Sequence, residues 1–169
     1  MSTKLITIFG ATGNQGGSVA KSLVQNPGFS VRGITRNPDS AASHELISRG
    51  IEMIKANGFN ADEMTAAFEG SWGAFVNINS DDNVFPRPKG LVFGYAKMTL
   101  QVFADPNAAT EFDLGKIIVG AAARAGVRHL VFSSGPPCTE MTGGQVRMKA
   151  MDSKVSCKIT VNYALTRQQ

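Results

Sequence analysis

The stretch Ile6–Ser18, ITIFGATGNQGGS, joins a short apolar run to four glycines and then to a segment with helical spacing. Gly10 permits a tight exit from a strand, Gly13 permits close approach of backbone to a pyrophosphate, and Gly16 permits a helix to pack close to a sheet. The N–H groups and the positive dipole end of that helix would then face phosphate groups. This GxxGxxG spacing predicts a dinucleotide-binding turn; the alternative is a glycine-rich turn that serves packing alone.

Predicted strands and helices alternate along the chain. Short runs of apolar and β-branched residues predict strands, and 3.6-residue spacing predicts helices. The predicted strands are Lys4–Phe9, Phe29–Thr35, Ile51–Lys55, Ala74–Ile78 and Val127–Ser133, and the predicted helices are Asn14–Val24, Pro38–Arg49, Ala61–Phe68 and Thr110–Ala125. This order predicts an α/β fold: a Rossmann-type doubly wound parallel sheet of about five strands with helices on both faces.

The composition is that of one domain, with 169 residues, 43% of them hydrophobic and 18% charged. No apolar run reaches the ~18 residues that cross a bilayer, and the start lacks a secretory signal, so we expect no membrane segment and a cytoplasmic location, or a nuclear one for a regulator. Cys138 and Cys157 are too few for a disulfide framework or a zinc site, so we expect two free thiols and no metal. The net charge is +4, but the Lys and Arg residues are scattered along the chain, which disfavours nucleic-acid binding. A small anionic ligand would account for this mild positive charge equally well.

The second predicted strand ends in GITRNPDS, Gly33–Ser40. An acidic residue here would bind the adenosine ribose hydroxyls, whereas the planar guanidinium of Arg36 suits a 2′-phosphate. Thr35, Asn37 and Ser40 are further donors nearby. The sequence therefore favours NADP, with NAD as the second choice; the alternative for Arg36 is an ordinary solvated side chain.

Residues after the third and fourth predicted strands should line the rest of the groove, because ligands lie beyond the carboxyl ends of such strands. Asn57 and Gly58, with Ala56, are expected at the adenine end, and Ile78–Ser80 at the pyrophosphate and nicotinamide ribose; Asn77 and Asn79 could instead form turns. The predicted dinucleotide contacts are Gly10, Ala11, Thr12, Gly13, Asn14, Gln15, Gly16, Arg36, Asn37, Pro38, Asp39, Ser40, Asn57, Gly58, Ile78, Asn79 and Ser80.

With these residues the chain resembles the NmrA-like family, atypical members of the short-chain dehydrogenase/reductase superfamily. The matching text includes ITIFGATGNQGGSVAKSL, VRGITRNP, AGVRHLVFSS and MDSK. The resemblance implies an NAD(P)-binding Rossmann domain. It also implies one of two functions: an NADP-dependent oxidoreductase acting on a small organic substrate, including in fungal secondary metabolism, or a non-catalytic redox sensor that regulates a transcription factor or an enzyme.

The family resemblance also locates the residues of hydride chemistry. The superfamily uses a tyrosine as proton donor four residues before a lysine that holds the nicotinamide ribose. Lys154 matches that lysine and joins the predicted dinucleotide contacts as the one candidate catalytic residue. The tyrosine position is Ala150, which cannot donate a proton, so catalysis by this chain stays open. Ser133 could orient a carbonyl or serve as a strand-end hydrogen bonder.

Two segments depart from the family pattern. We expect a Rossmann domain over residues 1–154 with an insertion at 84–101, a non-family tail at 155–169, and no substrate-binding region. Each segment begins with Val and ends with Gln, which is compatible with translated introns; the alternative is a shortened protein with an insertion and its own C-terminal strand. A sheet that ends at its fifth strand would leave one edge unpaired, so we expect either reduced stability or a homodimer.

Overall fold

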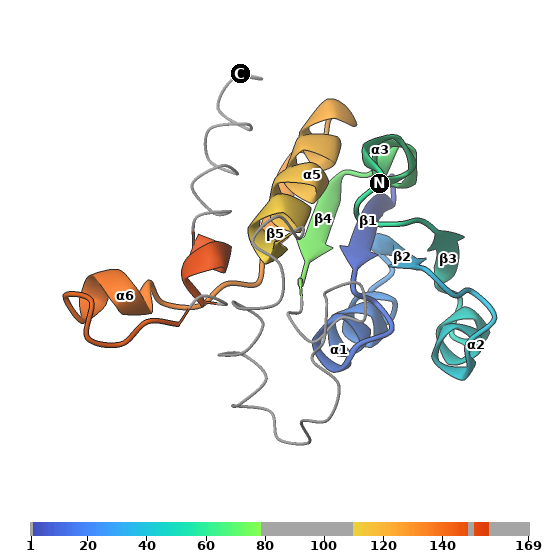
Figure 1. Ribbon diagram of the computed structural model, residues 1–169. Coiled ribbons are helices and arrows are strands. Elements are labelled where there is room, and N and C mark those ends of the chain that lie inside the picture. The colour runs from blue at the N-terminus through green and yellow to red at the C-terminus, as the bar shows by residue number, and fades with distance from the viewer. Residues whose placement is uncertain (1, 79–109, 149–150, 156–169) are drawn as a thin grey trace.

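The computed structural model describes residues 2–78, 110–148 and 151–155 (Figure 1). Its elements in chain order are β1 (Lys4–Phe9), α1 (Asn14–Leu23), β2 (Phe29–Thr35), α2 (Ala41–Ser48), β3 (Glu52–Lys55), α3 (Ala61–Phe68), β4 (Gly73–Val76), α5 (Glu111–Arg124), β5 (His129–Phe132) and α6 (Cys138–Met141). The predicted insertion at 84–101, the predicted tail beyond residue 155, and Asn79, Ser80 and Ala150 lie outside the described residues.

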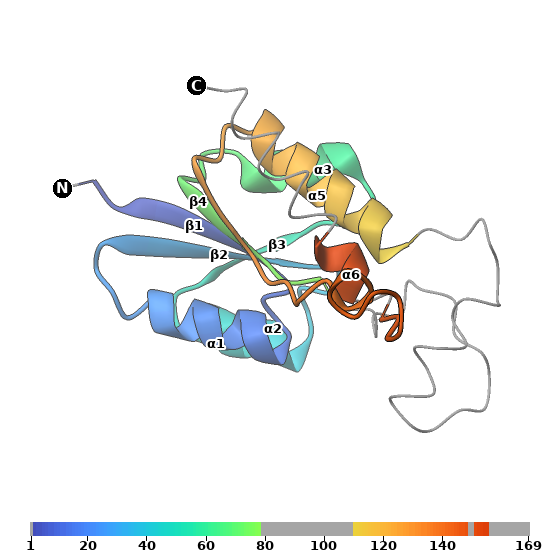
Figure 2. The ribbon, with the colours of Figure 1, turned by 90° about the vertical axis from the view of Figure 1, so that its left-hand side faces the viewer.

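The five strands form one parallel sheet in the order β3-β2-β1-β4-β5. Helices α1 and α2 cover one face, and α3 and α5 cover the other (Figure 2). This arrangement confirms the predicted doubly wound α/β fold. The chain runs outward from β1 to β3 on one side and from β4 to β5 on the other, so the crevice between β1 and β4 is the switch point where such sheets bind ligands.

A hydrophobic core lies on each face of the sheet, as strands buried on both sides require. On the α1 and α2 face the core includes Ile8, Val31 and Leu46. On the α3 and α5 face it includes Phe68 and Ile118. These side chains are at most 3% exposed, so the sheet is a fixed platform for the loops at its ends.

A capping side chain decides where helix α2 begins. The predicted helix Pro38–Arg49 in fact begins at Ala41, because the Ser40 hydroxyl accepts a hydrogen bond from the Ser43 backbone N–H at 3.2 Å. Residues before Ser40 form a turn instead, in which the Asp39 N–H donates to the Asn37 side chain at 3.2 Å. The start of α2 is therefore three residues later than predicted, and the loop after β2 is correspondingly longer.

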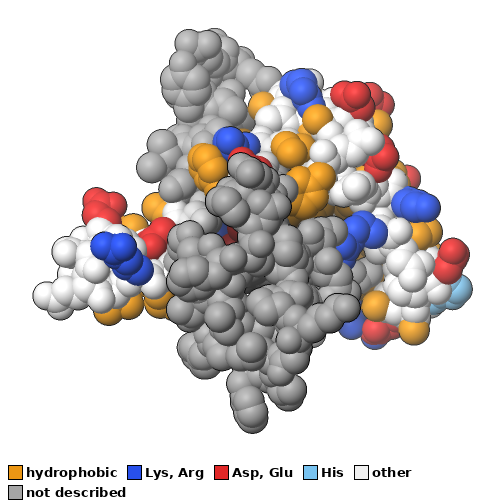
Figure 3. Space-filling model, in the orientation of Figure 1, with side chains coloured by type: hydrophobic (Ala, Val, Ile, Leu, Met, Phe, Trp, Pro, Cys, Tyr) orange, Lys and Arg blue, Asp and Glu red, His pale blue; other side chains and the backbone are white. Residues whose placement is uncertain are grey.

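The described surface carries charges of both signs. On the face seen in Figure 3, Lys and Arg side chains are interspersed with Asp and Glu, so the net positive charge is not gathered into one stripe there. None of the helices in the described ranges is long and apolar enough to span a membrane. Cys138, at the start of α6, is a free thiol, while Cys157 lies outside the described residues.

Candidate functional site

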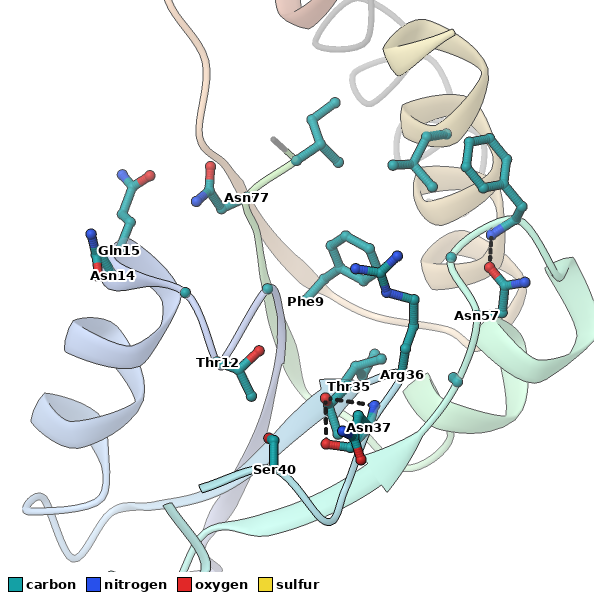
Figure 4. A pocket seen from close by; sticks show the side chains of 18 of the residues that line it. Phe9, Thr12, Asn14, Gln15, Thr35, Arg36, Asn37, Ser40, Asn57 and Asn77 are labelled. Carbon is teal, nitrogen blue, oxygen red and sulfur yellow. Dashed lines mark hydrogen bonds between the residues drawn. The ribbon is translucent and has the colours of Figure 1, made fainter. Parts of the chain in front are cut away.

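A pocket of about 710 Å³ lies at the carboxyl ends of β1, β2, β3 and β4 (Figure 4). Its volume is within the range of small-molecule and cofactor sites. The lining residues are Phe9, Gly10, Thr12, Gly13, Asn14, Gln15, Ile34, Thr35, Arg36, Asn37, Ser40, Ala56, Asn57, Gly58, Phe59, Asn77, Ile78, Leu114 and Lys154. The structure thus brings most of the predicted contact residues together in one hollow at the switch point of the sheet.

Of the predicted contacts that the structure describes, four do not line the pocket: Ala11, Gly16, Pro38 and Asp39. Ala11 is fully buried in the core of the α1 and α2 face. A Cβ at Gly16 would overlap the backbone carbonyl of Gly10, so this glycine faces the turn, and helix α1 packs close to the sheet as predicted. Ala11 and Gly16 therefore shape the glycine turn from the side of the core, whereas Pro38 and Asp39 belong to the loop after β2.

The turn after β1 depends on the backbone of Gly10. Its φ of +80° is in the left-handed region, and a Cβ there would lie 2.8 Å from the Asn77 carbonyl oxygen at the end of β4. The Gly13 N–H donates to the Gly10 carbonyl at 3.0 Å, which closes the turn. The chain therefore leaves β1 sharply and directs the start of α1 toward the pocket, as predicted.

The N-terminus of α1 opens on the pocket without a competing anion. No side chain caps it, and no acidic residue lies in its first turn. Asn14 and Gln15 line the pocket from this turn, and Asn77 faces them from the end of β4 (Figure 4). Backbone N–H groups and the positive dipole end are thus available to an anionic ligand.

Ser133 links the end of β5 to this same turn. Its hydroxyl donates to the Gln15 side-chain oxygen at 2.9 Å. This contact matches the interpretation of Ser133 as a strand-end hydrogen bonder. It also fixes the Gln15 amide at the rim of the pocket, a link between distant segments that the sequence did not indicate.

The loop after β2 presents Arg36 and uses its neighbours as supports. The Thr35 hydroxyl accepts from the Asn37 N–H, and the Ser40 hydroxyl lies 2.8 Å from that of Ser43. These side chains, predicted as ligand donors, therefore also order the loop. The Arg36 side chain extends into the pocket (Figure 4). Among the described residues that line the pocket, Arg36 and Lys154 carry a positive charge, and none carries a negative charge.

Apolar side chains form part of the wall, and sequence reasoning missed them. Phe9, Ile34, Phe59 and Leu114 line the pocket together with Gly58. A Cβ at Gly58 would lie 2.8 Å from the Leu114 side chain, so glycine keeps this wall closely packed. Flat apolar surface beside polar loop ends suits an aromatic base.

The loop after β3 is held by its own hydrogen bonds. The Asn57 side-chain oxygen accepts from the Phe59 N–H at 3.1 Å (Figure 4), and the Asn57 N–H donates to Glu63 at 2.8 Å. Asn60 then caps α3 through two backbone N–H groups. The predicted contacts Asn57 and Gly58 therefore lie in a preformed turn.

Lys154 reaches the pocket from the segment 151–155, which lies beside the start of α5. Its Nζ lies 3.8 Å from Oε1 of Glu111, and the two side chains are 18% and 7% exposed. Ile78 also lines the pocket, whereas the neighbouring predicted contacts Asn79 and Ser80 lie outside the described residues. The described residues contain no group of three or more His, Cys, Asp and Glu side chains that could hold a metal ion.

Comparison with known proteins identifies the family. The model of the NmrA-like family matches residues 2–165. The chain belongs to the NmrA-like family. Among curated relatives, the NmrA-like family domain-containing oxidoreductase FrzB of Cladobotryum sp is 62% identical over 152 residues, which cover 90% of this chain and 40% of that protein. The corresponding oxidoreductase lnaB of Aspergillus flavus is 60% identical over 151 residues, with 89% and 40% covered. This NmrA-like chain thus spans about 40% of the length of these relatives.

Solved structures share the fold at lower identity. The negative transcriptional regulator NmrA, solved in complex with NADP, has a TM-score of 0.69 and 23% identity, with 97% of this chain and 42% of that chain covered. The quinone oxidoreductase QOR2 of Escherichia coli, solved with NADPH, has a TM-score of 0.64 and 19% identity, with 94% and 45% covered. Both likenesses confirm the Rossmann-type fold of the NmrA-like chain.

Proposed function

We propose that this chain binds NADP(H) in the pocket at the switch point, as the nucleotide-binding part of an oxidoreductase that acts on a small organic substrate. The observation that carries the proposal is the position of Arg36. It follows β2, where an acidic residue would favour NAD, and its side chain extends into a pocket lined by no acidic residue among those described. The names of the curated relatives support the oxidoreductase assignment.

The residues present suit each part of the dinucleotide. The Gly10–Gly13 turn and the uncapped start of α1 offer backbone N–H groups to the pyrophosphate. Arg36 would pair with the 2′-phosphate through a charge-assisted, bidentate contact. The apolar wall that contains Phe9 and Leu114 would pack against the adenine. No acidic side chain among the described lining residues would repel the phosphates.

Hydride transfer would take place at the nicotinamide end of the pocket, near Lys154. Bound NADPH would supply a hydride to the substrate. Lys154 lines the pocket and would hold the nicotinamide ribose by hydrogen bonds from its ammonium group. Proton donation to the substrate would need a group other than residue 150, because Ala150 has no ionisable side chain.

The lack of a donor at Ala150 favours a second function, a redox sensor that binds the dinucleotide without turning over a substrate. Its partner would be a transcription factor or an enzyme. Both functions require cofactor binding, so only a measurement of substrate turnover distinguishes them. Substrate-dependent oxidation of NADPH by the purified chain supports the oxidoreductase, whereas tight binding without turnover of any small carbonyl, alkene or imine supports the sensor.

The proposal is tested by titrating NADP⁺ and NAD⁺ calorimetrically into the wild-type chain and the Arg36→Met variant. We expect the wild type to prefer NADP⁺, and Arg36→Met to lose about 10- to 100-fold in NADP⁺ affinity, because a charge-assisted contact contributes about 1.5–3 kcal/mol. The NAD⁺ affinity should change little, since NAD⁺ has no 2′-phosphate.

Arg128→Met is the matched control for this test. Arg128 is an exposed arginine immediately before β5, at the opposite edge of the sheet from the pocket. Its removal lowers the net charge by the same amount and should leave both affinities at the wild-type value. Equal loss of NADP⁺ affinity in the two variants, or no preference for NADP⁺ in the wild type, contradicts the assignment of Arg36.

A further inference from the structure

Glu111 is a buried carboxylate beside the pocket, and the proposed binding of NADP(H) does not explain why it is there. It is the first residue of α5 and is only 7% exposed. A carboxylate at a helix N-terminus is favoured by the helix dipole, but the first turn of α5 is already capped through Thr110 and Asp113. Capping therefore does not account for a second, buried acid in the same turn.

Lys154 is a charged partner of Glu111. The ammonium nitrogen of Lys154 lies 3.8 Å from Oε1 of Glu111. The segment 151–155, to which Lys154 belongs, lies beside the start of α5 (Figures 1 and 2). The lysine lines the pocket and the glutamate does not, so Glu111 contacts Lys154 from outside the pocket lining.

The low solvent exposure of Lys154 and Glu111 strengthens the attraction between their charges. The Lys154 side chain is 18% exposed, so its long flexible stem is largely enclosed. Attraction between unit charges is much stronger in such a setting than in water. A lysine ammonium is a compact charge on a rotatable stem, so a fixed counter-charge restricts where it can lie.

We infer that Glu111 is a positioning residue that holds the Lys154 ammonium toward the nicotinamide half of the bound dinucleotide. Lys154 comes from the segment after β5, whereas Arg36 comes from the end of β2 on the other side of the switch point. The two cations therefore serve different halves of the ligand. This inference rests on the proposed function and assigns a role to a residue that never touches the ligand.

The test compares two ligands in a double-mutant cycle on the full 169-residue chain. The ligands are NADP⁺ and adenosine 2′,5′-bisphosphate, which lacks the nicotinamide half. The variants are Glu111→Gln, Lys154→Gln and the double variant. We expect Lys154→Gln and Glu111→Gln each to weaken NADP⁺ binding about 10-fold, the value of one charge-assisted hydrogen bond. Adenosine bisphosphate binding should stay at the wild-type value, and Glu111→Gln should cause no further loss when Lys154 is already absent.

Two further variants guard against loss of folding and against a general effect of removing an ion-paired acid. Glu111→Asp keeps the carboxylate with one methylene less and should recover part of the NADP⁺ affinity; it replaces Glu111→Gln in the cycle if the latter does not fold. Glu52→Gln removes the carboxylate that pairs with Arg32 at 2.8 Å, between β3 and β2 and outside the pocket, and this variant should bind both ligands as the wild type does. Urea unfolding of each variant checks that it is folded.

Different results overturn the inference and the function on which it rests. Unchanged or tighter NADP⁺ binding by Glu111→Gln overturns the positioning role. So does an equal loss for both ligands, or a Glu111→Gln effect that persists in full without Lys154, because a merely structural acid would behave in that way. A wild-type chain that binds neither ligand overturns the proposed function together with this inference.

Discussion

At the scale of single residues, two helical glycines with opposite surroundings test the packing of the turn. Gly16 lies in α1, where a Cβ would overlap the Gly10 carbonyl, while Gly120 lies in α5 with nothing within 4 Å of the position of a Cβ. Both have ordinary helical backbones, so alanine is compatible with each backbone conformation. Any difference between the two substitutions therefore reports the space around them.

We expect Gly16→Ala to lower the free energy of unfolding by about 1–3 kcal/mol, because the added methyl forces α1 away from the turn. Gly120→Ala should raise it by about 0.5–1 kcal/mol, because alanine restricts the unfolded chain and favours the helix. Urea titrations of both variants and the wild type measure the two changes. The same sign for both would contradict the close approach of α1 to the sheet.

Site residues in the loops that follow the strands could be predicted from sequence, whereas the side chains of the apolar wall could not. Gly10 and Arg36 lie at strand ends whose position follows from the alternation of strands and helices, so their place in the pocket was predictable. Phe9 and Leu114 have the same chemistry as core residues, and both pack against the core of the α3 and α5 face or belong to it. Only the folded chain separates a pocket wall from a core at such positions.

At the scale of elements, the start of α5 is stabilised by a reciprocal capping box. The Thr110 hydroxyl accepts from the Asp113 N–H at 3.2 Å, and the Thr110 N–H donates to the Asp113 carboxylate at 3.0 Å. This box fixes the first turn of the helix that carries Glu111. Thr110→Ala should lower the free energy of unfolding by about 1 kcal/mol, the usual cost of a lost N-cap. Thr3→Ala, at an exposed position before β1, is the control, and equal urea midpoints for the two variants would contradict the capping role.

The capping box also predicts a pH dependence. Hydrogen bonds from the Thr110 side chain and backbone, with the nearby Lys116, hold the pKa of Asp113 below its usual range. A carboxyl group whose pKa is lowered on folding stabilises the fold above its unfolded pKa of about 4, and the gain is lost as the pH falls through the folded value.

Asp113→Asn should therefore be less stable than the wild type at pH 7, and the difference should shrink as the pH falls below about 4. Urea unfolding of both proteins over this range measures it. Asp113 is exposed enough for water to screen it, so the difference at pH 7 should be modest. A difference that does not depend on pH would contradict the proposed ionic contribution.

Element boundaries show where local sequence signals compete. The helix predicted from Thr110 to Ala125 is found at Glu111–Arg124, with Thr110 and Ala125 as its two caps. Here the N-cap residue and the alanine-rich sequence that follows it both favour the same helix. The helix predicted from Pro38 begins later, because Asn37 and Ser40 use their side chains to bond the backbone of the turn. Proline at a first helical turn and serine at an N-cap are both common, and only the folded loop decides between them.

At the scale of the whole molecule, the sheet order places the site. Parallel strands bring all carboxyl ends to one edge, and the reversal between β1 and β4 opens a crevice there. The glycine turn, the loop with Arg36 and the segment with Lys154 meet at this crevice from three separate parts of the chain. The alternation of strands and helices predicted this edge of the sheet from sequence. The pairing of Lys154 with Glu111 depends on how α5 packs, and no pattern in the sequence near either residue indicates it.

The central claim is that NADP(H) binds at this edge of the sheet, and amide NMR tests it most directly. Glycine amides mark both edges: Gly10, Gly13 and Gly58 line the pocket, whereas Gly70 and Gly126 precede β4 and β5 at the opposite edge. On titration of the ¹⁵N-labelled chain with NADP⁺, we expect large saturable shifts at the first group, together with Arg36, and small shifts at the second. Shifts centred on Gly70 and Gly126, or no saturable shift at the pocket glycines, would contradict the claim.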